Sequence, residues 1–369
     1  MKKIGIYIHA PFCRSKCPYC DFYSERADSR DHDEYTLSVV SAMERYSSEL
    51  RREADTLYLG GGTPSLLGGK NVALIITAAK RLFNVDGEIT VECNPSCIED
   101  GFFDMIAEAG ANRASIGLQS AVDSERRQLG RLSDARRVAE VIEASRSAGI
   151  DNISLDVMLG IPKQTPESLA ETLAFCAQAS IPHVSAYMLS LEEGTYFYKN
   201  ADRLDLPDED MTARLYEQCG DFLCGKGYVN YEISNFALPG FESRHNLKYW
   251  SCDEYLGIGP AAHSFIDGKR FYYPRDRRYF MDGGEPVSDG EGGSRGEYVM
   301  LRLRLAEGLV FADYEKRYGE KFPSGAVDAA SSLAADGLMK VTDRAISLTR
   351  RGFLLSNPVI ARIEENFIM

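Results

Sequence analysis

Three cysteines crowd into one short segment near the start of the chain, at Cys13, Cys17 and Cys20. Thiolates at such spacing can hold a metal centre, and three of them leave one iron of a cuboidal [4Fe–4S] cluster without a protein ligand. An amino acid can fill that position by chelating the iron through its amine and carboxylate. The spacing therefore predicts an iron–sulfur cluster with one open iron.

Three other interpretations of these cysteines compete with the cluster. Zinc would need a fourth ligand, for which His9 is a candidate, but structural zinc sites usually come as paired short motifs. The segment CPYC (residues 17–20) also looks like a dithiol redox motif, although such motifs lack a third cysteine four residues upstream. Buried structural cysteines are the third alternative, and the flanking Arg14 and Lys16 argue against them. The cluster is the favoured interpretation.

Polar residues also stand at the ends of several predicted strands. The glycine-rich turn GGGTP (residues 60–64) follows the second strand, where glycines let backbone groups approach a ligand closely. Glu92 ends the third strand, Gln119 lies just past the fourth, and Asp156 sits within the fifth. Because the carboxyl ends of parallel barrel strands meet at one mouth, we expect these groups to converge there.

The elements that would position these residues follow an alternating pattern of short apolar strands and longer amphipathic helices. Six βα units in a row predict an α/β fold with a parallel sheet, either an open doubly wound sheet or a barrel. The predicted strands are 4–9, 56–59, 88–92, 113–117, 153–159 and 183–189, and the predicted helices are 34–52, 71–83, 101–109, 135–148 and 166–179.

The last third of the chain has a different pattern. Residues 282–296 are rich in Gly, Ser and acidic residues without periodicity, which predicts a linker or long loop. Beyond it, helices at 297–305, 311–318 and 326–336 and strands near 338–341 and 345–348 predict a small α-rich domain of winged-helix-like type. We therefore expect a barrel over residues 1–265, a connecting segment and linker over 266–296, and a second domain over 297–369.

Composition limits the classes of function. The 369 residues carry a net charge of −13, which argues against nucleic acid as the main partner despite the aromatic and basic segment FYYPRDRRYF (residues 271–280). No apolar stretch is long enough for a membrane helix, and the N-terminus lacks the features of a signal peptide. Nine cysteines, an odd number, favour thiolate chemistry in a reducing compartment. We therefore expect a cytoplasmic protein.

Several motifs together resemble those of the radical SAM superfamily, whose members bind S-adenosylmethionine (SAM). These are the CxxxCxxC spacing of residues 13–20, the GGGTP turn and the ExNP pattern of residues 92–95. The strings IGLQS (116–120) and LGIPKQT (159–165) are similar to the branch that contains oxygen-independent coproporphyrinogen III oxidase and the HemW haem chaperones. Residues 297–309 and 348–355 resemble the C-terminal domain of that branch. The resemblance therefore covers nearly the whole chain.

This resemblance implies a partial barrel of six βα units that holds a [4Fe–4S] cluster and SAM. Arg131 would pair with the SAM carboxylate, whereas Asp156 or Gln119 would hold the ribose hydroxyls. It places the cluster on Cys13, Cys17 and Cys20, and SAM against Tyr7, Tyr19, Gly61, Gly62, Thr63, Glu92, Gln119, Arg131, Asp156 and Met188.

Two features separate the oxidase from the chaperone. The oxidases have a further cysteine two residues after the third cluster ligand, where this sequence has Phe22, and their longer N-terminal extension is absent. The segment HNLKYW (residues 245–250) matches the HNxxYW signature of HemW-type proteins. The favoured function is therefore a haem chaperone that passes haem to an acceptor protein. The alternative is a porphyrin-modifying radical enzyme, and an RNA-modifying radical enzyme is disfavoured by the acidity.

The HNxxYW segment provides the predicted haem site. His245 would be an exposed axial ligand, while Tyr249 and Trp250 would offer a flat apolar face, and Asn246 belongs to the same segment. Reductive cleavage of SAM would require an electron donor such as flavodoxin or ferredoxin, and contact with a membrane surface is left open. Cysteines without an assigned role are Cys93, Cys97, Cys219, Cys224 and Cys252, the last a candidate second haem contact.

Overall fold

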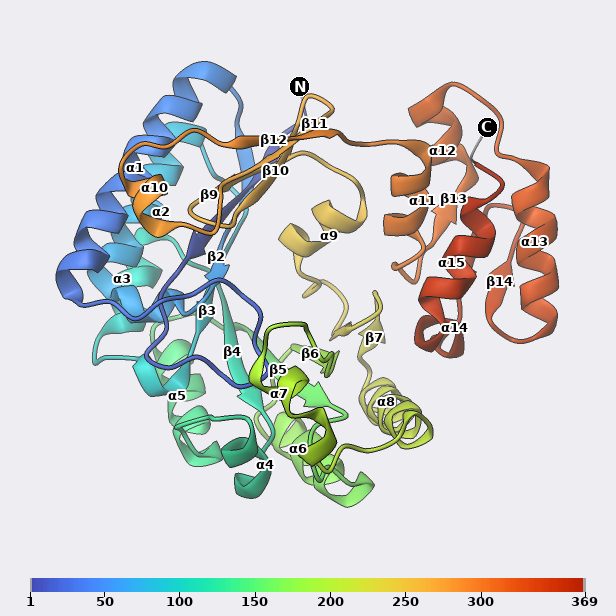
Figure 1. Ribbon diagram of the computed structural model, residues 1–369, viewed down its shortest axis with the longest axis horizontal. Helices are drawn as coiled ribbons and strands as arrows, with labels where there is room; N and C mark the ends of the chain where they lie inside the picture. Colours follow the sequence, from blue (N-terminus) through green and yellow to red (C-terminus); the bar gives the residue numbers. More distant parts are fainter. Residues whose placement is uncertain (1, 368–369) are drawn as a thin grey trace.

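The computed structural model describes residues 2–367 as one large curved sheet with helices on its outer side and a smaller C-terminal domain beside it (Figure 1). The large sheet has twelve strands in the order β12-β11-β10-β9-β1-β2-β3-β4-β5-β6-β8-β7. Strands β1 to β6 are parallel neighbours in sequence order. The two edges, β12 and β7, do not pair with each other. This arrangement confirms the predicted α/β fold and its partial (β/α)6 barrel.

The strands of the large sheet are β1 (Ile4–Ala10), β2 (Ala54–Gly61), β3 (Glu88–Cys93), β4 (Arg113–Gln119), β5 (Asn152–Leu159), β6 (His183–Met188), β7 (Val229–Asn230), β8 (Asn235–Ala237), β9 (Tyr255–Ile258), β10 (His263–Ile266), β11 (Lys269–Tyr272) and β12 (Val287–Glu291). Its helices are α1 (Ser29–Leu50), α2 (Gly69–Phe83), α3 (Phe102–Ala109), α4 (Asp123–Gln128), α5 (Ala135–Ser147), α6 (Pro166–Gln178), α7 (Tyr196–Lys199), α8 (Glu209–Gly225), α9 (Arg244–Trp250) and α10 (Arg277–Met281).

The parallel strands form where the sequence has short, almost continuous apolar runs, as expected for strands covered on both faces. In β1 every residue but Tyr7 is buried, and all seven residues of β4 are buried. The helices begin at polar caps. Asp28 accepts from the backbone of Asp31 before α1, and Thr165 caps α6, which has proline in its first turn. The six predicted strands are found at nearly the predicted residues, whereas α1 begins at Ser29, ahead of the predicted start at residue 34.

The segment 266–296, which was expected to be a connecting segment followed by a linker, instead contains regular structure. Strands β11 and β12 and helix α10 all lie within it, and both strands pair antiparallel to extend the large sheet. Every residue of β12 is exposed, so the strand needs no alternation of apolar and polar residues. Gly290 at positive φ and a register irregularity further disguise this strand in the sequence.

The C-terminal domain is small and rich in helices, as predicted. Its elements are α11 (Arg295–Arg302), β13 (Leu309–Val310), α12 (Phe311–Tyr318), α13 (Ser324–Ala335), β14 (Met339–Val341), β15 (Ala345–Leu348), α14 (Arg350–Leu354) and α15 (Ser356–Glu364). The three strands form a separate antiparallel sheet in the order β13-β15-β14. The succession of helix, strand, two helices and a β-hairpin is that of a winged-helix domain.

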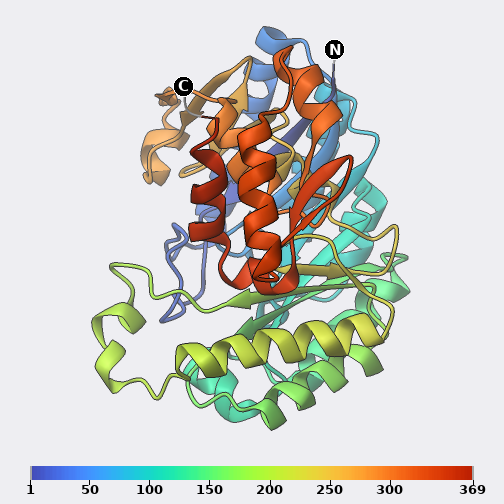
Figure 2. The ribbon, with the colours of Figure 1, turned by 90° about the vertical axis from the view of Figure 1, so that its right-hand side faces the viewer.

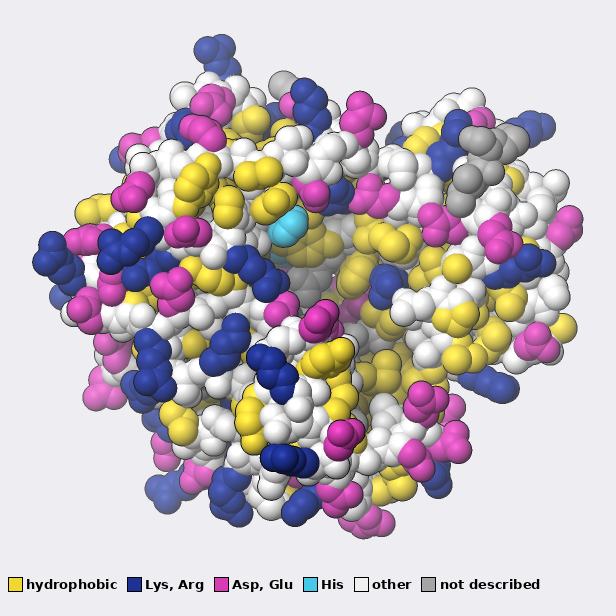
Figure 3. Space-filling model, viewed as in Figure 1, with side chains coloured by type: hydrophobic (Ala, Val, Ile, Leu, Met, Phe, Trp, Pro, Cys, Tyr) yellow, Lys and Arg dark blue, Asp and Glu magenta, His cyan; other side chains and the backbone are white. Residues whose placement is uncertain are grey.

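This domain packs against the later part of the large sheet, where Figure 2 shows it facing the viewer. Glu232 and Leu305 form an isolated bridge, and Arg350 of α14 pairs with Asp221 of α8. On the face in Figure 3, the molecule is hollowed between the two parts, and basic and acidic side chains are interspersed around the hollow. Within residues 2–367, no helix combines the length and apolar character needed to cross a membrane.

Candidate functional site

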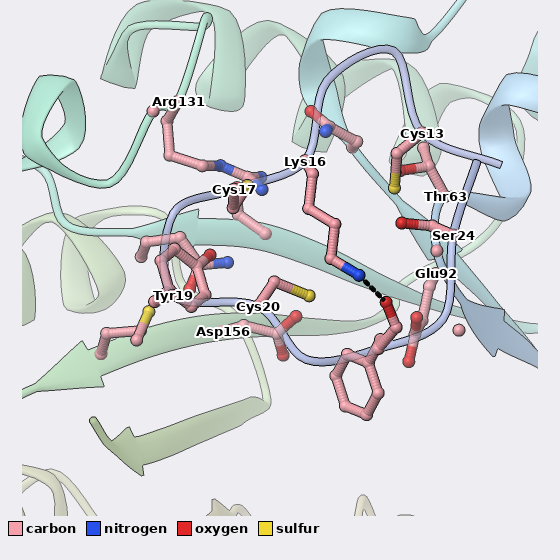
Figure 4. A pocket seen from close by; sticks show the side chains of 18 of the residues that line it. Cys13, Lys16, Cys17, Tyr19, Cys20, Ser24, Thr63, Glu92, Arg131 and Asp156 are labelled. Atoms are coloured by element: carbon pink, nitrogen blue, oxygen red, sulfur yellow. Dashed lines mark hydrogen bonds between the residues drawn. The ribbon is translucent and has the colours of Figure 1, made fainter. Parts of the chain in front are cut away.

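A cavity of about 610 Å³ opens at the carboxyl ends of β2 to β6, where the polar strand-end residues were expected to meet. All three cysteines of residues 13–20 line it, together with every predicted SAM contact except Tyr7. Those lining contacts are Tyr19, Gly61, Gly62, Thr63, Glu92, Gln119, Arg131, Asp156 and Met188. Figure 4 shows the loop that carries the cysteines curving over Glu92 and Asp156.

We call residues 11–25 the cysteine loop. Its two ends are joined at the base, because Cys13 N donates to Glu25 O at 3.0 Å and Glu25 N donates to Pro11 O at 2.8 Å. Cys13, Cys17 and Cys20 are half-buried free thiols, and Cys13 Sγ lies 3.4 Å from Thr63 Oγ1. Burial raises the pKa of the Cys20 thiol to about 11. A positive metal centre would favour its thiolate form.

Charged and apolar contacts hold this loop against the rest of the barrel. Arg277 at the start of α10 pairs with Glu25 at 3.2 Å and with Asp31 at 2.5 Å. Arg275 pairs with Asp21 at 2.9 Å, and within the loop Lys16 Nζ donates to the carbonyl of Phe22 (Figure 4). On the other side the Tyr19 ring packs on a small apolar cluster formed by Leu129, Met158, Ile161 and Phe197.

The three cysteine side chains are spread around the cavity rather than gathered at one point. In the described part of the chain, no three His, Cys, Asp or Glu side chains are placed to hold a single metal ion. A zinc site needs four ligands around one ion, whereas a [4Fe–4S] cluster distributes its thiolate ligands over separate irons. Three thiolates are the protein ligands that a [4Fe–4S] cluster with one open iron needs, whereas a structural zinc site needs a fourth ligand.

His9, the candidate fourth zinc ligand, supports the loop instead. Its Nε2 lies 2.9 Å from the carbonyl of Tyr23, and its Nδ1 lies 3.0 Å from the Tyr7 hydroxyl. The side chain is buried, and burial lowers the pKa of His9 to about 4. Both ring nitrogens are therefore engaged within the protein. Tyr7, which does not line the cavity, supports the site through His9.

The glycines of the GGGTP turn pack closely against β1 and the start of the cysteine loop. Gly61 has φ of 104°, and a Cβ there would lie 2.6 Å from the His9 ring. A Cβ on Gly62 would lie 2.7 Å from the Phe12 carbonyl, and Gly62 N donates to Ala10 O at 2.8 Å. Any larger residue would displace the start of the cysteine loop. The glycines therefore bring the turn and the loop together at the cavity wall.

Glu92 lies half-buried in the cavity, where Tyr58 donates from its hydroxyl to Glu92 Oε1 at 2.8 Å. Burial raises the pKa of Glu92 to about 7, and the nearby Asp156 carboxyl raises it further against the effect of Tyr58. The same desolvation raises the pKa of Asp156 to about 6, although Ser115 donates to Asp156 Oδ1 at 3.2 Å. A ligand that brings positive charge would stabilise the ionised forms of these two desolvated carboxyls.

Arg131 and Gln119 reach the cavity from the end of β4 and the loop beyond it. Arg131 uses one guanidinium nitrogen to donate to the carbonyl of Gly117 at 3.0 Å. Gln119 has φ of 67°, and the pairing of β4 with β5 shifts register between Gly117 and Gln119. Such an irregularity redirects a side chain at a strand end, and a non-glycine residue at positive φ stores strain. Both features coincide with the cavity.

The prediction that His245 is exposed is wrong. The side chain is 0 % exposed, and both ring nitrogens are occupied: Nδ1 lies 2.8 Å from Thr56 Oγ1 and Nε2 lies 2.8 Å from the Tyr249 hydroxyl. The ring also stacks on Tyr58 with centroids 5.2 Å apart. Burial lowers the pKa of His245 to about 3, so the ring is neutral. In this arrangement His245 offers no nitrogen to an iron.

The rest of the HNxxYW segment forms a joint between the sheet and the C-terminal domain. Glu88 of β3 accepts from the first backbone N–H groups of α9 at 3.0 Å, and Lys248 pairs with Asp55 at 2.8 Å. Trp250 lies under the guanidinium of Arg304, 5.9 Å from ring centroid to Cζ. Asn246, Tyr249 and Trp250 are all half-buried. The segment therefore has structural contacts on both sides.

Some cavity residues were missed by sequence reasoning. Tyr58, Ser115 and Tyr187 line the wall beside the predicted contacts. Strand alternation is a signal that could have found Tyr58, because it places Tyr58 on the same face of β2 as Gly60. Cys93 lines the cavity but is buried, which agrees with a packed strand-end residue.

Comparison with known proteins agrees with this architecture. The model of the radical SAM superfamily matches residues 7–176, and the model of the HemN C-terminal domain matches residues 296–355. The solved structure of coproporphyrinogen III oxidase (HemN) from Escherichia coli, described as a radical SAM enzyme, superposes with a TM-score of 0.84 at 22 % identity. It covers 98 % of this chain and 90 % of HemN. The chain is therefore a member of the radical SAM superfamily.

Curated relatives define the branch within that superfamily. A protein named heme chaperone HemW from Lactococcus lactis is 32 % identical, with 98 % of this chain and 97 % of the relative covered. HemW of Bacillus subtilis is also 32 % identical, over 96 % of this chain and 97 % of the relative, and HemW of E. coli is 35 % identical over 82 % and 83 %. The chain belongs to the HemW family, as the sequence motifs predicted.

Proposed function

We propose that this protein is a haem chaperone with a radical SAM fold, which binds haem, a [4Fe–4S] cluster and SAM and delivers haem to an acceptor protein. The observation that supports it most directly is the near full-length similarity to relatives named heme chaperones. The cavity adds support, because it gathers three free thiols and nine of the expected SAM contacts in one place.

Cys13, Cys17 and Cys20 would hold the cluster, and a bound cluster with an open iron supplies an electron for reductive cleavage of SAM. The residues around it suit the methionine part of SAM. Arg131 has guanidinium N–H groups beyond the one bound to Gly117 and can pair with the carboxylate. Glu92 can accept from an N–H of the ligand's amine, and the positive sulfonium of SAM would lower the pKa of the Glu92 carboxyl.

The opposite end of the ligand would meet Asp156 and Gln119, which can accept from and donate to ribose hydroxyls. Met188 and Tyr19 line the cavity as apolar contacts. Turnover of SAM in this site would need an electron donor such as flavodoxin or ferredoxin. We place the protein in the cytoplasm, where reduced thiols can assemble a cluster.

The oxidase alternative is weaker at one particular residue. The oxidases of this branch have a further cysteine two residues after the third cluster ligand, and here Phe22 presents an exposed aromatic ring at that place. A phenyl ring supplies neither a thiol nor a proton. We therefore propose that coproporphyrinogen III is not converted to protoporphyrinogen IX.

The test is anaerobic reconstitution with iron and sulfide, followed by haem titration and an oxidase assay on the same sample. We expect one haem per chain with a distinct Soret band, and no protoporphyrinogen IX after incubation with coproporphyrinogen III, SAM and a reductant. Product formation would support the oxidase, and a chain that binds no haem would contradict the chaperone. Haem-loaded protein mixed with an apoprotein acceptor should then lose its Soret band as the acceptor gains one.

A further inference from the structure

An imidazole that binds haem iron must present an unoccupied ring nitrogen to solvent, and only one histidine of residues 2–367 has an exposed side chain. His9, His32 and His245 are 8 % exposed or less. His183 is also buried, and its two nitrogens lie within 2.8 Å of Ser154 Oγ and the Tyr231 hydroxyl. The remaining histidine is His263, the first residue of β10.

The setting of His263 is suited to metal ligation. It pairs with Tyr272 across the antiparallel β10–β11 ladder, and the two rings stack with centroids 5.2 Å apart and planes 22° apart. Its ring nitrogens form no hydrogen bond with the described part of the chain. Stacking covers a face of the imidazole and leaves the nitrogens at the ring edge free. The ring is thus oriented by the protein and still available.

His263 also lies at the end of the sheet that carries the cysteine loop. Strand β9 runs parallel to β1, and β10 returns antiparallel to β9, so β10 begins at the carboxyl end of β1. The turn between β9 and β10 packs there, because a Cβ on Gly259 would lie 2.7 Å from the carbonyl of His9. Haem bound at His263 would therefore lie beside the proposed cluster and SAM site.

Neighbouring groups match the rest of the haem molecule, which is a flat apolar ring with two carboxylates. The aromatic and basic segment 271–280 carries exposed Arg275 and Arg278, of which Arg275 is close enough to His263 to affect its pKa, and such cations suit propionates. Arg275 pairs with Asp21, and the next residue of the cysteine loop, Phe22, offers an exposed apolar ring. This gives a role to a segment that is otherwise unexplained.

The charge state of His263 is compatible with ligation. Partial burial lowers the pKa of His263, and Arg270 and Arg275 add to this, while Asp289 of β12 opposes it. The ring is therefore neutral at pH 7, with a lone pair available for iron.

We propose that His263, and not His245, is the axial imidazole ligand of the haem iron, with Tyr272 stacked on the ligand ring and Arg275 and Arg278 facing the haem propionates. This rests on the proposed function, since it names the ligand for the haem that a chaperone would bind. The proposed haem site is therefore the exposed edge of the sheet at His263, in place of the buried α9 segment predicted from the sequence.

The experiment is a haem titration of the full-length protein followed by its Soret band and by dissociation constants. Four proteins are compared: wild type, His263→Ala, His245→Ala and Lys269→Ala, the last an exposed residue of β11 as a control. We expect His263→Ala to shift the Soret band and weaken binding at least tenfold. Free imidazole should restore the wild-type band in His263→Ala. His245→Ala and Lys269→Ala should keep the wild-type band.

The outcomes separate the two claims. If wild-type protein binds haem and His263→Ala has an unchanged Soret band, the ligand assignment is overturned while the chaperone function stands. If the Soret band shifts in His245→Ala but not in His263→Ala, His245 of α9 is the axial ligand. If the wild type binds no haem, the proposed function fails and the assigned ligand fails with it. Haem dimethyl ester should bind more weakly than haem if Arg275 and Arg278 meet the propionates.

Discussion

The cysteine loop and helix α9 are the two regions marked most clearly by short motifs, yet the protein treats their reactive groups in opposite ways. The thiols of Cys13, Cys17 and Cys20 are half-buried and free and face a cavity of about 610 Å³. The imidazole of His245 is fully buried, and both of its nitrogens are bonded within the protein. One motif leaves its donor atoms open to a ligand, and the other uses them to join strands and helices.

The difference shows that residue type and spacing do not by themselves identify a ligand site. A buried polar group without a partner is costly, so a histidine in a core forms hydrogen bonds and becomes part of the structure. What separates the two cases is whether the hydrogen-bonding capacity of the group is already filled. Variants in the two regions should therefore fail differently, by loss of cofactor in the loop and by loss of stability in α9.

The largest effect is expected in the cysteine loop. Anaerobically reconstituted wild-type protein should be brown and contain about four irons per chain. Cys17→Ser should lose nearly all of this iron, because an alcohol replaces a thiolate ligand. Iron and sulfide analysis with the absorbance near 400 nm provides the measurement. Cys93→Ser is the control and should keep its iron, and zinc in place of iron in wild-type protein would contradict the cluster.

The next largest effect is on the stability of the α9 joint. His245→Ala removes hydrogen bonds to Thr56 and Tyr249 and leaves a cavity against Tyr58. The free energy of unfolding should therefore fall by about 2–4 kcal/mol. Denaturant unfolding of the apoprotein measures this. Asn246→Ala on the same helix, where the structure gives the side chain no hydrogen bond within residues 2–367, should lose less than about 1 kcal/mol. Equal losses in the two variants would mean that His245 is not the centre of the joint.

A smaller effect concerns Glu92 and pH. Its pKa is raised to about 7 in the folded protein, above the value of 4.5 expected when the chain is unfolded. The folded state therefore holds a proton that the unfolded state releases, and the stability gained below pH 4.5 is lost as pH rises through about 7. Between these pH values the free energy of unfolding of the wild-type apoprotein should fall by about 1–3 kcal/mol, and that of Glu92→Gln should fall by less.

The companion variant is Asp156→Asn, which should also reduce the pH dependence. It removes a carboxyl whose own pKa is raised to about 6, and it removes a charge that raises the pKa of Glu92. Unfolding curves at pH 5 and pH 8 compare the three proteins. A Glu92→Gln variant with the full pH dependence of the wild type would show that another group titrates.

The smallest effect tests the residue that touches both regions. Tyr58 stacks on His245 and donates a hydrogen bond to Glu92, so Tyr58→Phe keeps the ring and removes only the hydroxyl. We expect stability to change by about 1 kcal/mol or less, and SAM affinity to fall by about tenfold or less because the Glu92 carboxylate loses a donor. Calorimetric titration with SAM gives the affinity. An affinity equal to that of the wild type would make Tyr58 a packing residue only.

Much of the barrel follows from local sequence signals. The six parallel strands have mostly buried side chains, so their apolar runs mark them clearly, and Thr165 caps α6 at its predicted start of residue 166, whereas α1 begins ahead of its predicted start. The cysteine spacing and the strand-end polar residues also predicted which residues share the cavity, since parallel strands end on one side.

Other features depend on contacts between distant residues. The burial of His245 depends on Thr56, which is 189 residues away, so the segment HNLKYW alone could not reveal it. Strand β12 is wholly exposed and therefore lacks a strand pattern. The positive φ of Gln119 coincides with the register shift against β5, which the sequence of a single strand cannot indicate.

The ion pairs that hold the cysteine loop join residues that are synthesised at very different times. Asp21 leaves the ribosome 254 residues before its partner Arg275, and Glu25 precedes Arg277 by 252 residues. At a synthesis rate of roughly 5–20 residues per second, the loop exists for about 13–50 s before its ionic clamps can form. During that interval the three thiols belong to a loop that lacks both of these ion pairs.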